Sequence, residues 1–178
     1  MPVAKHLGLS GSDADAAVEQ LYAAYWRQLV RLATMLVRDQ AAAEDLVQDA
    51  FVAMHGRWSR LRDPDKALAY LRQAVVNRSR SALRHRVVVD RHLRSSSPGD
   101  VVVEGPGLAG SRRDAVLAAL AQLSERQREV LVLRHYLDYS EAQIADALGI
   151  SRGAVKAHAH RGSAALRDLL GEWWEDAS

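Results

Sequence analysis

The sequence predicts an all-α protein built from two small helical domains that a flexible linker joins. Apolar residues recur at steps of three and four over most of the 178-residue chain, which is the spacing of amphipathic helices rather than strands. This pattern fails in one stretch rich in Gly, Pro and Ser, which is typical of a connector. The length suffices for two small cores. We place the domains at 14–94 and 112–172 and the linker at 95–111.

Three helices are expected in the N-terminal domain. The first covers 16–37, and the second covers 41–58. The core stripe of the second helix has steps of four, three and four: Val47, Phe51, Met54 and Trp58. The third helix begins after Pro64, because proline is tolerated in the first turn of a helix but not in its interior. We expect it to end near residue 86 and the valine runs at 87–89 and 101–103 to be extended linker, since two isolated short strands are only marginally stable.

The C-terminal domain shows clear helix boundaries. Its first helix begins near residue 112. Ser124 followed by Gln127, and Ser140 followed by Gln143, have the spacing of capping boxes, so each pair is expected to open a helix. Gly149 would end the second of these helices as a left-handed cap. The last helix would run from a cap at residue 151 to about residue 170.

Residues 140–170 have the form of a helix-turn-helix. The inner positions are expected to be Ile144, Ala145, Leu148, Val155, Ala159 and Leu166. The outer side of the last helix carries Arg152, Lys156 and His160 at steps of four, with Arg161 beside them. A helix of this kind fits the major groove of DNA. The absence of acidic residues from 151 to 167 favours DNA binding over a helical hairpin that merely has a basic exterior.

Charge is unevenly distributed along a chain whose net charge is only +2. Residues 13–56 hold seven acidic and three basic residues, hence −4, whereas residues 57–94 hold eleven basic and three acidic residues, hence +8. Basic blocks attract nucleic acids through phosphate contacts and counterion release, although a solvated surface is the usual meaning of a charge run. We therefore predict that the basic block binds nucleic acid.

Two polar faces lie within these blocks. Asp45, Gln48, Asp49 and Val52 share the side of the second helix opposite its core stripe. Gln73, Asn77, Arg80 and Arg84 form a stripe on the third helix. Asparagine is a poor residue for a helix interior, and its amide can both donate to and accept from a base edge, so Asn77 is a candidate contact. The alternative for both faces is an ordinary solvated surface.

Several classes of function are not expected. The chain has no cysteine, which excludes disulfides, thiol catalysis and Cys-ligated metals. It shows no phosphate loop and no nucleophile elbow, so we expect neither an enzyme nor a bound cofactor. His158 and His160 point about 200° apart on a helix, which is unsuited to a shared metal ion. Without a long apolar run, we expect a cytoplasmic protein that does not insert into membranes.

At this point several motifs together resemble a known family. The run Ala43–Phe51 (AEDLVQDAF) resembles the core-polymerase-binding segment of bacterial sigma factors, and Ala69–Asn77 (AYLRQAVVN) resembles the promoter-melting helix that follows it. The segments 123–130, 140–145 and 149–156 are similar to the C-terminal sigma domain. The ordered set resembles the extracytoplasmic-function (ECF) group, and residues 154–167 resemble its actinobacterial SigE-like branch.

The resemblance implies a sigma region 2 helical bundle, a sigma region 4 helix-turn-helix, and a role for each candidate residue. The residues implied to bind core RNA polymerase are Asp45, Leu46, Gln48 and Asp49. The residues implied to act at the −10 promoter element are Trp58, Gln73, Asn77, Arg80 and Arg84. The loop 58–64 is implied to form part of the same site. Those implied to face the −35 element are Ser151, Arg152, Lys156, His158, His160 and Arg161.

The partners implied are core RNA polymerase and promoter DNA, and the resemblance also admits an anti-sigma factor, whose identity and existence the sequence leaves open. Asp49 stands where the family commonly has Glu, and histidines stand at 158 and 160 in place of bulkier or more basic residues. The −35 sequence preference therefore does not carry over. The alternative function is a stand-alone helix-turn-helix transcriptional regulator.

Overall fold

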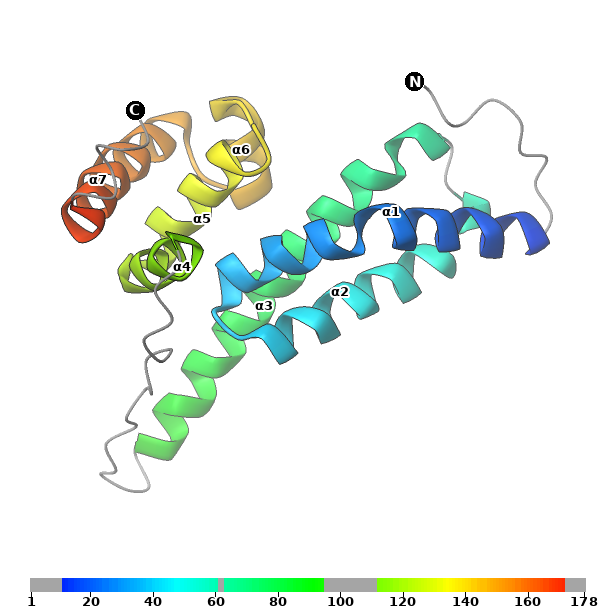
Figure 1. The fold of residues 1–178 in the computed structure, drawn as a ribbon, viewed down its shortest axis with the longest axis horizontal. Coiled ribbons are helices and arrows are strands. Elements are labelled where there is room, and N and C mark those ends of the chain that lie inside the picture. Colours follow the sequence, from blue (N-terminus) through cyan, green and yellow to red (C-terminus); the bar gives the residue numbers. More distant parts are fainter. Residues whose placement is uncertain (1–10, 61–62, 95–111, 172–178) are drawn as a thin grey trace. The chain divides into compact units, whose positions relative to one another are not determined.

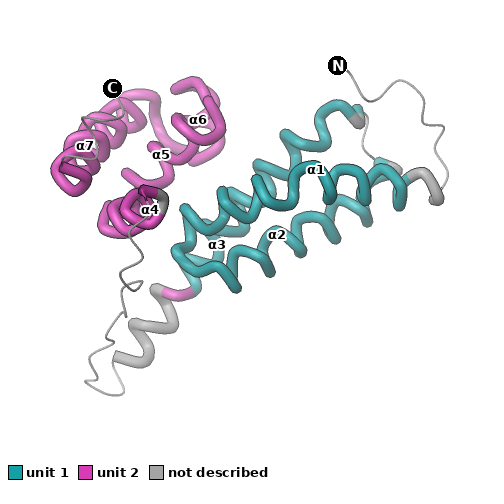
Figure 2. The backbone as a smooth tube through the Cα atoms, in the orientation of Figure 1, with its two compact units in different colours: residues 1–85 teal, residues 86–178 magenta. Residues whose placement is uncertain are grey.

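The computed structural model describes residues 11–60, 63–94 and 112–171 (Figure 1). Across these residues there are seven α-helices and two short 3-10 turns and no strand, which confirms the all-α prediction. The chain divides into two compact units, residues 1–85 and 86–178 (Figure 2). This division falls inside the third helix, so the domain boundaries at 94 and 112 stay predictions.

The first two helices form an antiparallel hairpin. Helix α1 spans Gly11–Val37 and begins before the predicted residue 16, and helix α2 spans Gln40–His55. Oδ1 of Asp39 caps α2 by accepting a hydrogen bond from the amide of Ala42 at 3.0 Å. At the other end of the hairpin, Nε2 of His55 lies 2.6 Å from Oδ1 of Asp15. The core between these helices combines buried aliphatic side chains with the ring of Phe51, which packs against Tyr22 and Trp26; the buried aliphatic residues include Leu29, Leu32, Leu36, Val47 and Met54.

Helix α2 ends three residues earlier than predicted. The backbone N–H of Gly56 bonds to the carbonyl of Val52, and the chain then turns through a 3-10 segment, Trp58–Arg60. The side chain of Trp58 is only 6% exposed. Trp58 is therefore a core residue, as its place in the apolar stripe indicates, although it lies outside the helix to which that stripe assigned it.

Helix α3 spans Ala67–Arg94 and follows a 3-10 turn at Pro64–Lys66. It buries Leu71, Val75, Val76 and Leu83. The helix continues past the predicted end near 86, so the expectation that residues 87–89 are extended linker is wrong. Residues 87–94 contain neither glycine nor proline, and the modest helix propensity of the three valines is not enough to end a helix. The second valine run, 101–103, lies outside the described residues.

The second unit contains α4 (Arg112–Gln122), α5 (Glu125–His135), α6 (Glu141–Leu148) and α7 (Arg152–Leu170). Helix α5 packs against both α6 and α7, and six consecutive residues of it, 128–133, are buried. Two of them are charged. Nη1 of Arg128 donates to the carbonyl of Leu123 at 3.2 Å, and Oε2 of Glu129 lies 2.7 Å from Nη1 of Arg126.

The predicted helix caps of this unit are confirmed. Both capping boxes are complete, and in the second one the amide of Ser140 donates to Oε1 of Gln143 at 2.8 Å. Gly149 closes α6 with a φ of 64°, a left-handed conformation that glycine adopts without steric cost. One inner position differs from the prediction, because Leu166 is half-buried while Gly162 and Leu170 are buried.

Two glycines in α7 have opposite environments, and this difference is testable. A Cβ on Gly162 would lie 3.1 Å from Cδ1 of Leu131 and 3.2 Å from Cβ of Gln127, whereas a Cβ on Gly153 would meet nothing closer than 3.9 Å. Overpacking a helix contact costs about 1–3 kcal/mol, and replacing glycine by alanine in a helix gains up to about 1 kcal/mol. Gly162→Ala should therefore lower the free energy of unfolding, and Gly153→Ala should leave it unchanged or raise it.

Thermal or urea unfolding of the two alanine variants measures this difference directly. Each variant serves as the control for the other, because both make the same chemical change in the same helix. Equal stabilisation by both substitutions would contradict the close α5–α7 packing at residue 162.

Candidate functional site

The exposed side of α2 carries the first candidate site. Asp45, Gln48 and Asp49 are exposed, and Val52 beside them is 65% exposed. Leu46 is half-buried at the edge of this face. These four exposed positions lie opposite the buried side chains of Val47 and Phe51, so they are not needed for the core. An acidic face that also exposes a large aliphatic side chain is suited to contact with a basic protein surface.

An open groove of about 630 Å³ lies between α2 and α3. Its lining combines apolar, amide, hydroxyl and arginine side chains with the ring of a tyrosine and the imidazole of a histidine, and no acidic residue contributes: Leu46, Arg57, Tyr70, Gln73, Ala74, Asn77, Arg78, Ser81, Ala82 and His85. Positive charge, hydrogen-bonding groups and an aromatic ring are what proteins use to hold single-stranded nucleic acid. The groove is therefore suited to a nucleotide strand.

A hydrogen bond orients the amide of Asn77 at this groove. Nε2 of Gln73 donates to Oδ1 of Asn77 at 3.1 Å, across one turn of α3. The side chain of Asn77 is exposed, so its Nδ2 group can donate to a ligand. The two amides predicted from the stripe thus act as a pair, with Gln73 supporting Asn77.

Arg78 was missed by the sequence reasoning and lies in the same groove. Its Nη2 donates to the backbone carbonyl of Asp49 at 3.2 Å, so it joins the groove helix to the acidic side of α2. The predicted stripe followed only one edge of α3, and Arg78 lies about 100° from Asn77 around the helix. The composition of the basic block was a signal for such a residue, but it did not single out Arg78.

Three other predicted residues lie elsewhere. Arg80 and Arg84 are not part of the groove lining, and Nη2 of Arg84 donates to Oγ of Ser81 at 3.1 Å. Trp58 is too deeply buried for its ring to stack on a base in this conformation. Trp58 is a core residue of the free protein, its assignment to DNA contact stays a prediction, and Tyr70 lines the groove.

The outer face of α7 exposes the basic residues expected of a recognition helix: Arg152, Lys156, His160 and Arg161. Ser151 is the N-cap, and its Oγ accepts a hydrogen bond from the amide of Ala154 at 3.1 Å. His158 is half-buried, and its Nδ1 is buried without a hydrogen-bond partner. His158 thus lies beside the outer face rather than on it.

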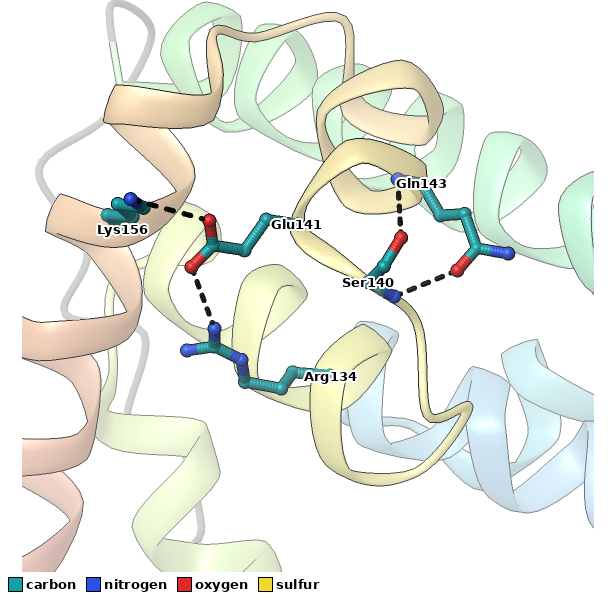
Figure 3. Close-up of polar contacts among 5 residues, drawn as sticks. All are labelled: Arg134, Ser140, Glu141, Gln143 and Lys156. Carbon is teal, nitrogen blue, oxygen red and sulfur yellow. Dashed lines mark hydrogen bonds and ion pairs between the residues drawn. The ribbon is translucent and has the colours of Figure 1, made fainter.

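An acidic residue that the sequence reasoning did not single out lies next to this face. The carboxylate of Glu141, at the start of α6, lies 3.1 Å from Nη2 of Arg134 and 3.8 Å from Nζ of Lys156 (Figure 3). Glu141 therefore joins α5 to the outer face of α7. The capping box that fixes its helix start was visible in the sequence, but the two ion pairs connect residues 7 and 15 positions apart and had no local signal.

Two further findings concern the described residues only. No three His, Asp or Glu side chains among them gather closely enough to hold a metal ion. None of the described helices is both long and apolar enough to cross a membrane.

Comparison with known families matches both units. The model of Sigma-70 region 2 matches residues 21–87, and that of Sigma-70, region 4 matches residues 113–166. The chain is 36% identical over 142 residues to RNA polymerase sigma-E factor of Streptomyces avermitilis, covering 80% of this chain and 78% of that protein. It is 34% identical over 175 residues to ECF RNA polymerase sigma factor SigL of Mycobacterium tuberculosis, covering 96% of this chain and 97% of the relative.

Solved structures show the same fold. The sigma factor RpoE of Bartonella quintana, in complex with the anti-sigma factor NepR, has a TM-score of 0.68 at 23% identity and covers 86% of this chain and 96% of its own. CnrH in complex with the cytosolic domain of CnrY has a TM-score of 0.59 at 27% identity and covers 90% of this chain and 94% of its own.

Proposed function

Because this chain belongs to the ECF family of RNA polymerase sigma factors, we propose that it directs core polymerase to promoters through three separate surfaces. The observation that carries the proposal is that an acidic face and an acid-free basic groove lie on adjoining helices and are linked by the Arg78–Asp49 hydrogen bond. One surface serves the polymerase and the other serves DNA. A stand-alone regulator has no need of the first, and both sigma regions are matched, so that alternative is set aside.

The acidic face of α2 binds core RNA polymerase. Its carboxylates, Asp45 and Asp49, are solvated in the free protein and take no part in the core. A basic surface on the polymerase would complement them electrostatically, and Val52 would supply apolar area that is otherwise exposed to water. RNA synthesis itself is carried out by the polymerase, so this chain acts as a binding subunit and not as an enzyme. It acts in the cytoplasm.

The α2–α3 groove holds an unstacked base and backbone of the non-template strand at the −10 element. Extruding a base costs a few kcal/mol, which a pocket can recover through edge hydrogen bonds. The oriented amide of Asn77 supplies such a contact, while Arg57 and Arg78 supply positive charge for the backbone. Tyr70 offers the ring on which a base can stack.

The outer face of α7 enters the major groove at the −35 element. Arg152 and Lys156 lie one turn apart near the start of this helix, and the N-terminal residues of a recognition helix reach base edges. An anti-sigma factor that covers one of these surfaces would silence the protein. The two solved relatives support such a partner, because one is bound to an anti-sigma factor and the other to the cytosolic domain of CnrY.

Replacing Arg152 and Lys156 on α7 tests the proposed contact with the −35 element. Each lost base contact costs about 1–3 kcal/mol, so Arg152→Ala/Lys156→Ala should weaken closed-promoter binding by the holoenzyme at least about tenfold. Gel shift or fluorescence anisotropy measures this loss. The matched control is Arg27→Ala/Arg31→Ala, which removes two exposed arginines one turn apart on α1. Equal promoter binding by the wild type and the α7 double variant would show that α7 does not contact the major groove of the DNA.

A further inference from the structure

We propose that Glu141 is a specificity-determining residue that restrains Lys156 and thereby lowers the affinity of the C-terminal domain for DNA of arbitrary sequence. This inference rests on the proposed DNA-binding role of α7 and adds to it a residue of opposite charge.

The position of Glu141 is fixed from two directions. It is the first residue of α6, directly after Ser140, and the reciprocal bonds between Ser140 and Gln143 hold the backbone at that point. Its carboxylate is hydrogen-bonded to Nη2 of Arg134 at 3.1 Å (Figure 3). The side chain of Glu141 is 24% exposed, so water screens it only in part. The carboxylate is thus a fixed negative charge.

Lys156 is the loosely held partner. Its Nζ lies 3.8 Å from Oε2 of Glu141, which is an ion pair rather than a short hydrogen bond, and its side chain is 67% exposed. An exposed ion pair of this kind is weak, so Lys156 can leave Glu141 for DNA. Because Glu141 lies within 4 Å of a residue on the recognition face, the carboxylate approaches DNA together with that residue.

The carboxylate of Glu141 weakens contacts to DNA phosphates more than contacts to base edges. A phosphate attracts Lys156 only through charge, and the fixed carboxylate both competes for Lys156 and repels the phosphate. A guanine edge offers two hydrogen-bond acceptors and carries no net charge, so it is repelled less. The carboxylate therefore weakens sequence-independent binding more than binding to the correct −35 element. Specificity is the difference between the binding free energy for the −35 element and that for DNA of other sequence. A repulsive group such as the Glu141 carboxylate can increase this difference.

The test replaces Glu141 with Gln, which keeps the shape and removes the charge. The full-length chain assembled with core polymerase is measured on two duplexes of equal length, one selected by the wild-type holoenzyme from random sequence and one scrambled. E141Q should bind the scrambled duplex about three- to tenfold more tightly and the selected duplex with little change. The salt slope on scrambled DNA should steepen by up to about one unit, since Lys156 gains a phosphate contact.

The chain offers a matched control in Glu125. It is the first residue of α5, it follows Ser124 in the same kind of capping box, and none of the described ion pairs includes it. E125Q thus removes the same charge from the same kind of helix start and should leave the ratio of the two affinities unchanged. If E125Q changed the ratio of the two affinities as much as E141Q does, the proposal would be overturned. The loss of any negative charge from this domain would then explain the change.

Lys156→Gln separates failure of this inference from failure of the proposed function. If α7 binds DNA through Lys156, K156Q should weaken binding to the selected duplex, and E141Q should tighten binding to the scrambled duplex less in the K156Q background than in the wild type. Unchanged binding of the selected duplex by K156Q would contradict the DNA role of Lys156. Weaker binding of the selected duplex by K156Q together with an unchanged or weaker affinity of E141Q for scrambled DNA would overturn only the role of Glu141.

Discussion

Replacing Asn77 with alanine is expected to abolish promoter opening by the holoenzyme while closed-complex binding remains. Opening a duplex without ATP requires that an unstacked base be trapped, because unstacking and unpairing cost a few kcal/mol. In the groove, the amide oxygen of Asn77 accepts a hydrogen bond from Gln73 at 3.1 Å, and the Asn77 side chain is exposed. We propose that closed-complex binding depends on α7, which this substitution does not touch.

Permanganate reactivity of unpaired thymines measures opening on a promoter selected by the wild-type holoenzyme. Asn77→Ala should lose this reactivity, and a promoter with a pre-melted bubble should partly restore transcription. Gln73→Ala, which removes the support but keeps the amide of Asn77, should retain an intermediate level. Wild-type melting of a fully paired promoter by Asn77→Ala would exclude the capture role.

Reversing the charge at Asp49 is expected to weaken binding to core polymerase by about tenfold or more. A like-charge contact within an interface costs several kcal/mol, and each 1.4 kcal/mol changes affinity tenfold. Asp49 is exposed on the face opposite the buried side chains of α2, so Asp49→Lys should leave the melting temperature nearly unchanged. The bond from Arg78 is to the backbone carbonyl of Asp49 and survives the substitution.

Competition of the variant with labelled wild-type protein for core enzyme measures this effect. Glu19→Lys is the control, since it makes the same charge change at an exposed position of α1. It should compete as well as the wild type does. Undiminished competition by Asp49→Lys would show that the acidic face of α2 is not a polymerase contact.

The helix boundaries that could be predicted from the sequence are those set by local chemistry. Ser124 and Ser140 each begin a helix because the residues that complete the cap stand three positions away, and Gly149 ends one because it tolerates a left-handed φ. The end of α3 was mispredicted at 86 because the apolar periodicity fades there, although no residue that breaks a helix appears before Pro98.

The candidate site was predictable only in part, because exposure follows from periodicity but contact between helices does not. The outward position of Asp49 and of Asn77 was correctly derived from the spacing of their apolar neighbours. The link from Arg78 to α2 and the ion pairs of Glu141 join residues from different helices, and no local pattern records them. Trp58 was assigned both to the core and to DNA; its burial confirms the core assignment, and the DNA assignment stays a prediction.

As an ECF sigma factor, this chain should give core RNA polymerase the ability to start at particular promoters. Run-off transcription with purified core enzyme on a library of genomic promoter fragments measures that ability. We expect discrete transcripts from a small set of promoters that appear only when the chain is added and that disappear with Asn77→Ala. Absence of any chain-dependent transcript, combined with sequence-specific DNA binding by the chain alone, would show instead that the chain is a stand-alone regulator.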